Sequence, residues 1–160
     1  MSVSLPPRHY ELAADLLATA LDRLDSPSGV SELTAVARER GTAVGAGVRR
    51  TAGAQPARAQ SLTALAAVLR EAGFEPDLET SSGTLFLRNC PYDALISDHR
   101  DLTCGMNLAW AEGVVDGLGT PTSVELAPEP GRCCVVFGTG VEVPQMAGVK
   151  RSRPASRAGA

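Results

Sequence analysis

The chain has 160 residues, of which 44% are apolar and 21% are charged, values close to those of ordinary globular domains, so we expect one folded core. Residues 1–149 hold all 18 acidic residues against 11 arginines, and residues 150–160 hold four basic residues, so the body of the chain carries a net charge of −7. Such a body lacks the basic surface that neutralises phosphates, which argues against a self-sufficient DNA-binding protein.

The chain shows neither a membrane span nor a secretion signal. It has no run of about 18 apolar residues, and residues 1–7 are too short for a signal peptide. We therefore expect a cytoplasmic protein with no membrane partner. Four cysteines are too few for a disulfide-dense secreted scaffold, and a reducing cytosol would keep them as thiols. Burial and metal binding are the two competing explanations for these cysteines.

The predicted elements begin with three helices. In the first, leucines recur at steps of three and four residues and so share one stripe. In the second, Gly41 and Gly45 are spaced to let another element approach closely. After Gly73 the apolar period changes from 3.6 to 2, which predicts strands. We expect helices over residues 8–25, 31–50, 61–72, 91–97 and 102–118, and strands over 74–79, 84–88, 124–127 and 133–137.

These elements predict an α+β fold, in which helices pack on an antiparallel sheet of about four strands in the order ααα-ββ-αα-ββ. Residues 8–137 would form this domain, after a loose leader over residues 1–7. Residues 138–160 lose periodicity and are rich in Pro, Gly and Arg, so we expect a disordered basic tail.

The four cysteines carry the most informative chemistry. Cys90 precedes Pro91 at the predicted start of one helix, and Cys104 lies in the predicted first turn of the next. Helix N-termini favour negative charge, so both positions predict thiols with a lowered pKa, as suits metal ligands. Cys133 and Cys134 are adjacent on a predicted strand and should point to opposite faces, so one would join the first two cysteines and the other would be buried core. Spacing alone is a weak signal, because free cysteine also serves as a small apolar residue.

Several short motifs, taken together, resemble one family. The sequence resembles the C-terminal sensor half of the actinobacterial helix-turn-helix regulators labelled ArsR-like, close to the SufR-type repressors of iron–sulfur assembly genes. Such proteins carry an Asn-Cys-Pro element, a cysteine before Gly-Met-Asn, and a late Cys or Cys-Cys. The resemblance covers roughly residues 8–137 and depends on residues 85–92, His99, residues 102–107 and residues 131–136.

The resemblance implies a cytoplasmic, dimeric sensor domain of a transcriptional regulator. Its implied ligands for an iron–sulfur cluster are Cys90, Cys104 and one of Cys133 or Cys134, with His99 as a further candidate. A fourth ligand that is weaker or external would leave the cluster labile. Family members place a winged-helix DNA-binding domain before this half, and the chain begins near that junction. DNA contact is therefore expected only through such a domain or a partner.

Two alternatives remain open from the residues. The domain could instead be a cluster-free module that binds a small apolar ligand or another protein, although plain helix packing explains the same apolar residues. An enzyme is not expected, because the chain has two histidines and no Gly-x-Ser-x-Gly, phosphate-loop or His-Glu-x-x-His motif. The residues that would line an apolar cavity are Leu108, Trp110, Val114 and Val115.

Overall fold

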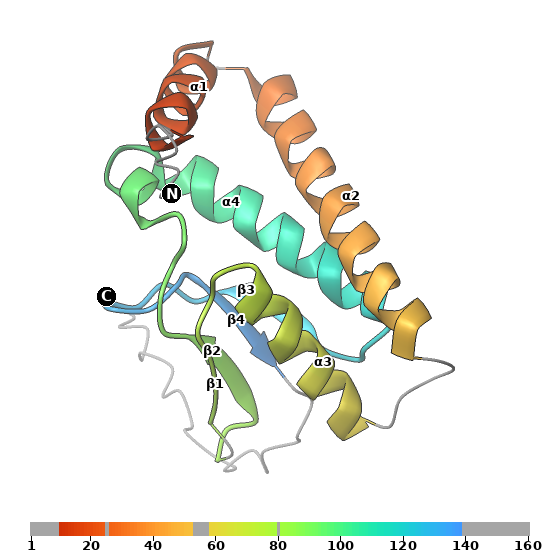
Figure 1. Ribbon diagram of the computed structural model, residues 1–160. Coiled ribbons are helices and arrows are strands. Elements are labelled where there is room, and N and C mark those ends of the chain that lie inside the picture. Colours follow the sequence, from red (N-terminus) through yellow and green to blue (C-terminus); the bar gives the residue numbers. More distant parts are fainter. Residues whose placement is uncertain (1–9, 25, 53–57, 80, 139–160) are drawn as a thin grey trace, which may run out of the picture.

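The predicted alternation of helices and strands is present in the computed structural model, which describes residues 10–24, 26–52, 58–79 and 81–138 (Figure 1). The α+β class and the antiparallel sheet of four strands are confirmed. The expected leader and all of the expected tail except Gly138 lie outside the described residues. The elements are α1 (Tyr10–Leu24), α2 (Pro27–Ala52), α3 (Arg58–Glu71), β1 (Pro76–Glu79), β2 (Thr84–Leu87), α4 (Asp93–Leu118), β3 (Ser123–Leu126) and β4 (Val135–Gly138).

The two helices predicted over residues 91–118 form one kinked element. α4 runs through this region, with non-helical backbone angles at His99 (φ −130°, ψ 40°). The kink falls between the two predicted helices, in the polar sequence Asp98-His99-Arg100-Asp101. The sequence therefore located the change of direction correctly, and α4 consists of two helical stretches that meet at the non-helical residue His99.

The sheet has the strand order β1-β2-β4-β3, and every neighbouring pair is antiparallel. Strands β1 and β2 form one hairpin and β3 and β4 another, and Gly83 supplies the positive φ of +65° that the first turn requires. Phe137 of the inner strand β4 pairs with Leu85 on one side and Val124 on the other. The core joins α3, α4, β2 and β4, and its fully buried side chains include Leu65, Leu69, Leu87, Val114, Val135 and Phe137.

Glycines on α2 and α4 bring these two parallel helices into backbone contact. A side chain at Gly41 would collide with the Trp110 carbonyl oxygen, and one at Gly113 would collide with the Arg38 carbonyl oxygen. Gly45 and Gly117 make the same approach one turn later. The close approach expected from the Gly41 and Gly45 spacing is confirmed. This contact fixes the helix that carries Cys104.

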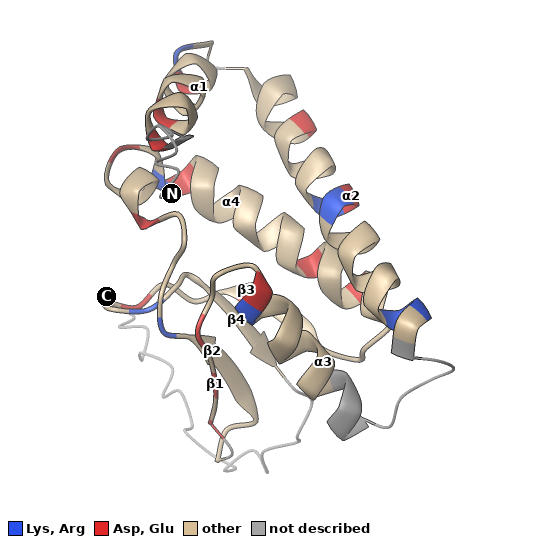
Figure 2. Ribbon diagram, viewed as in Figure 1, with Lys and Arg blue, Asp and Glu red and all other residues tan. Residues whose placement is uncertain are grey.

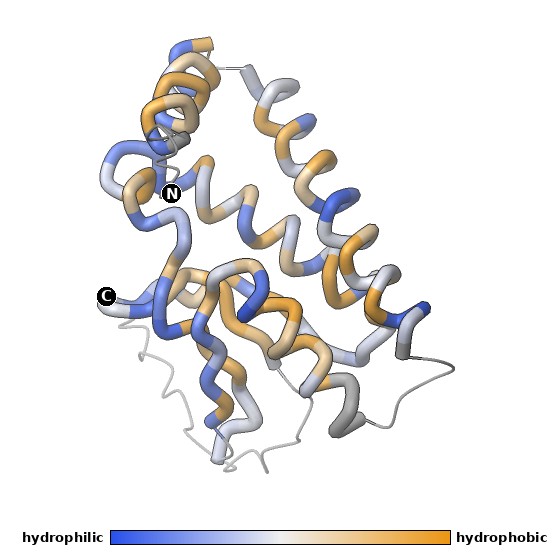
Figure 3. Tube along the Cα trace, viewed as in Figure 1, coloured by the Kyte–Doolittle hydropathy of each residue, from blue (hydrophilic) through white to orange (hydrophobic). Residues whose placement is uncertain are grey.

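α1 lies across the start of α4 and leaves most of its leucines uncovered. Figure 3 shows apolar positions recurring along α1, yet Leu12, Leu16, Leu17 and Leu24 are 58–72% exposed. Leu21 alone of the predicted stripe is half-buried. The core of the domain therefore lies between α3, α4 and the sheet, and the leucine stripe of α1 contributes little to it.

Charged residues lie mainly on the outside of this arrangement. Figure 2 shows basic residues scattered over several elements and gathered on none of them. Arg38 of α2 pairs with Glu112 and, at 3.0 Å, with Asp116 on α4. Among the residues described, none of the helices combines the length and apolar character of a membrane span.

Candidate functional site

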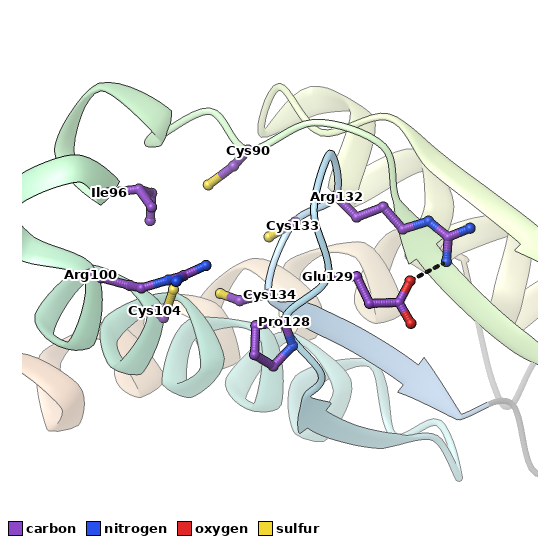
Figure 4. Close-up of a pocket in the computed structure, with 9 residues that line it drawn as sticks. All are labelled: Cys90, Ile96, Arg100, Cys104, Pro128, Glu129, Arg132, Cys133 and Cys134. Atoms are coloured by element: carbon purple, nitrogen blue, oxygen red, sulfur yellow. Dashed lines mark hydrogen bonds and ion pairs between the residues drawn. The ribbon is translucent and has the colours of Figure 1, made fainter.

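All four cysteines line a single pocket between the start of α4 and the segment before β4. The pocket measures about 290 Å³, including the part open to solvent. The cysteines come from three separated stretches of the chain, and Figure 4 shows their sulfur atoms directed into the same space. All four are free thiols. The remaining lining residues are Ile96, Arg100, Pro128, Glu129 and Arg132.

Asn89 fixes the position of Cys90. Its side-chain oxygen accepts a hydrogen bond from the Glu75 backbone N–H at 2.6 Å, and its amide donates to the Gly73 carbonyl at 2.8 Å. The Cys90 carbonyl accepts the Asp93 N–H at 3.2 Å, just before α4. The hydrogen bonds of Asn89 thus connect the segment after β2 to the turn after α3. They fix the backbone from which the Cys90 thiol enters the pocket.

Cys104 is presented by α4, five residues after the kink at His99. Its side chain is buried and belongs to the main core cluster, as well as lining the pocket. The neighbouring residue Thr103 lines a different, apolar pocket between α1, α2 and α4. Consecutive residues of one helical turn therefore face two separate cavities.

The expected separation of Cys133 and Cys134 onto opposite faces is wrong. β4 begins only at Val135, so the two cysteines precede the strand and do not follow its alternation. The Cys133 N–H donates to the Leu87 carbonyl at 2.9 Å, and the Cys134 carbonyl accepts the Ala127 N–H at 2.8 Å. Backbone hydrogen bonds to the end of β2 and to the residue after β3 hold Cys133 and Cys134 in place. Both thiols line the pocket.

Two of the four thiols, those of Cys90 and Cys133, favour their neutral forms. The Cys133 thiol and then burial raise the pKa of Cys90, while the Cys134 thiol is the largest cause of the raised pKa of Cys133. The lowered pKa expected for Cys90 at a helix start is therefore wrong, because thiol contacts and burial outweigh the helix terminus. A metal at this site would have to displace protons, so its binding would strengthen as pH rises.

Asn107 is a member of the site that the sequence did not single out. Its side chain is only 2% exposed, and its amide Nδ2 donates to the Cys133 sulfur at 3.2 Å. Asn107 lies three residues after Cys104 and therefore on the same face of α4. The available signal was its place in the Gly-Met-Asn motif after that cysteine.

Two arginines bring positive charge to the pocket. Arg132 is held by Glu129 at 3.2 Å and lies over the Phe86 ring, 4.4 Å from its centroid. Arg100, by contrast, has no ion-pair partner within residues 10–24, 26–52, 58–79 and 81–138. A guanidinium without a carboxylate partner is suited to stabilise negative charge that develops on thiolates.

His99, the further candidate ligand, does not line the cysteine pocket. Its Nδ1 donates to the Asp22 carboxylate, and its Nε2 lies 3.5 Å from Asp15 and 3.4 Å from the Thr19 hydroxyl. All three partners belong to α1. The structure places His99 as a link between α1 and α4.

The apolar residues considered for a ligand cavity serve mainly as core. Val114 and Val115 are buried in the main cluster, and Trp110 stacks on Phe74 with the ring centroids 5.9 Å apart. Leu108 lines an open depression between α2 and α4. Leu108 also packs against the main cluster, so the plain packing interpretation fits all four residues.

In the part of the chain that the structure describes, no three Cys, His, Asp or Glu side chains are arranged to hold a single metal ion. The raised pKa values of Cys90 and Cys133 mean that metal ligation would require these two thiols to lose protons. No known protein family, curated protein or solved structure matches this chain.

Proposed function

We propose that this chain is the sensor domain of a transcriptional regulator and that it binds an iron–sulfur cluster through Cys90, Cys104 and one or both of Cys133 and Cys134. The observation that carries the proposal is the convergence of four thiols, from three separated segments, on one pocket. Buried cysteines that served only as small apolar residues would have no reason to gather in this way.

The chemistry of the pocket fits such a group. Cysteine thiolates are the usual ligands of iron–sulfur clusters, which supply redox and oxygen sensitivity when bound. Several iron atoms bridged by sulfide need ligands spaced more widely than those of a single ion. Arg100 lines the same pocket and supplies charge opposite to that of the thiolates. An amide N–H to sulfur, as from Asn107, is a contact that tunes such sites.

The proposed regulation uses the path from the pocket to α1. Cys104 lies on α4, and the kink of the same helix holds α1 through His99. α1 exposes leucines that would be covered in a homodimer. Ligand binding that favours one arrangement of α4 would shift the equilibrium between monomer and dimer. This shift would change DNA binding by an upstream or partner domain.

The experiment is anaerobic purification and reconstitution, with visible absorption and separate counts of iron and acid-labile sulfide. The wild type should be coloured and contain both elements, and Cys90→Ser or Cys104→Ser should lose them. Ser82→Ala, in the β1–β2 turn away from the pocket, is the matched control. A colourless wild type after reconstitution, or one that binds zinc in place of iron and sulfide, rejects the cluster.

A second candidate is a cluster-free sensor of small apolar molecules. The favouring observation is a mainly apolar pocket between α1, α2 and α4, since apolar linings with few polar groups are typical of small-molecule sites. An apolar fluorescent probe should then bind, and the Cys90→Ser plus Cys104→Ser double variant should keep its affinity unchanged. Loss of probe binding in Leu102→Gln would assign it to this pocket, whose lining is Ala14, Leu17, Ala18, Leu21, Leu33, Leu95, Leu102, Thr103 and Met106.

A further inference from the structure

We infer that Cys133, and not Cys134, is the third ligand of the cysteine site, and that Asn107 is the positioning residue that holds its sulfur. This inference rests on the proposed function and extends it to a choice between two adjacent cysteines. It also assigns a role to a buried residue that is not itself a ligand. The two thiols differ in their side-chain and backbone contacts.

The first distinguishing contact is the hydrogen bond from Asn107. Its amide donates to the Cys133 sulfur at 3.2 Å, and the side chain is almost fully buried. No bond from a side-chain amide to Cys134 occurs within the described residues. An amide N–H can donate equally to a free or to a metal-bound sulfur, so this contact would persist when a ligand is held.

The second distinction lies in the backbone. The Cys133 N–H donates a hydrogen bond to the carbonyl of Leu87, which lies three residues before Cys90. The two cysteines therefore lie on segments that are held side by side. Both of their side chains line the same pocket. The Cys134 carbonyl accepts a hydrogen bond from the N–H of Ala127, the residue after β3. Cys133 is therefore the member of the pair that the fold ties to the first ligand.

The third distinction involves α4. Cys104 and Asn107 are three residues apart, so this helix presents a ligand and the hydrogen-bond donor to the next ligand on one face. The close packing of Gly113 and Gly117 against α2 fixes the same helix. A rigid helix thus sets the position of Cys133 relative to Cys104.

The first experiment compares Cys133→Ser with Cys134→Ser after anaerobic reconstitution of the full chain. Cys133→Ser should lose most of its iron and sulfide, whereas Cys134→Ser should keep the amounts and the spectrum of the wild type. The opposite result, or an equal loss in both variants, would overturn the assignment.

The second experiment removes the donor with Asn107→Leu, which keeps a side chain of similar volume. Iron should pass to a chelator about 10-fold faster than in the wild type, and the reduction potential should shift. Thr103→Val is the matched control, because it removes a buried hydroxyl from the same helix without touching the pocket. A wild-type release rate and potential in Asn107→Leu would refute the positioning role. Asn107→Met serves the same purpose if the leucine variant does not fold.

The third experiment needs no iron and separates this inference from the proposed function. In metal-free protein, Asn107→Leu should lower the rate of alkylation of Cys133 relative to Cys134 at a fixed pH, as measured by mass spectrometry, because the amide N–H stabilises the thiolate that reacts. Thr103→Val should leave the ratio of the two rates unchanged. A colourless wild type would reject the cluster alone, while an unchanged ratio in Asn107→Leu would reject the role of Asn107.

Discussion

The imidazole of His99, at the kink of α4, donates from Nδ1 to the carboxylate of Asp22 on α1. The other ring nitrogen faces Asp15 on the same helix, so two carboxylates surround one buried ring. Asp22 is the main cause of the raised pKa of His99, and Asp15 adds to it. This cluster is the principal polar connection between α1 and the rest of the domain.

The docking of α1 should therefore weaken as pH rises. Because the folded pKa of His99 lies above its unfolded value of about 6.5, the stabilisation is complete below that value and is lost as pH rises through the folded pKa. The free energy of unfolding, measured by denaturant over this range, should fall in the wild type and change less in Asp22→Asn. Asp98→Asn, an acidic neighbour that does not pair with His99, should behave as the wild type does. The same pH slope in Asp22→Asn would contradict this interpretation.

The strands and hairpins were predictable because their signals are local. Short runs of apolar residues mark β2 and β4, and Gly83 and Gly131 mark turns with positive φ. The close helix contact at Gly41 was predictable for the same reason, since small residues four apart lie on one helical face.

The site was predictable only in part, because its contacts are long-range. The Cys90 and Cys104 positions followed from nearby proline and helix signals. The pairing of Asp22 with His99 joins residues 77 apart, and the contact of Asn107 with Cys133 joins residues 26 apart, so neither leaves a local pattern. The alternation expected of a strand does not apply to Cys133 and Cys134, because β4 begins at the next residue, Val135. Tertiary packing decides such contacts.

The glycine contact between α2 and α4 predicts opposite effects for two similar substitutions. Gly113→Ala would force its methyl group into the backbone at Arg38, so it should destabilise the fold by about 1–3 kcal/mol. Gly47→Ala, in open space on α2, should stabilise the fold by about 0.5–1 kcal/mol through helix propensity. Denaturant unfolding measures both values. A neutral Gly113→Ala would show that the helices do not pack this closely in solution.

Arg100 should raise the reduction potential of a bound cluster. Its positive charge favours the more negative, reduced state, so Arg100→Gln should lower the potential measured by anaerobic titration. Arg70→Gln, at an exposed position of α3, removes the same charge away from the pocket and should leave the potential unchanged. If both variants shifted the potential equally, the effect would come from net charge and not from the position of Arg100.

The exposed leucines of α1 predict a self-association surface. Leu16 is 60% exposed, and burying a leucine is worth about 1.5–3 kcal/mol. In a symmetric dimer each substitution acts twice, so Leu16→Glu should weaken dimerisation by at least about 100-fold. Sedimentation over a range of concentrations should then show a dimer for the wild type and a monomer for the variant.

Leu126→Glu is the control for this experiment, because Leu126 is 46% exposed on the edge strand β3 and lies outside α1. It should leave the dimer intact, and circular dichroism should show both variants folded, since neither leucine belongs to the core. If Leu126→Glu dissociated the dimer while Leu16→Glu did not, subunits would meet through the edge of the sheet. The contact between His99 and α1 would then not affect dimerisation. Changes of pH or of the cysteines would leave the dissociation constant of the dimer unchanged.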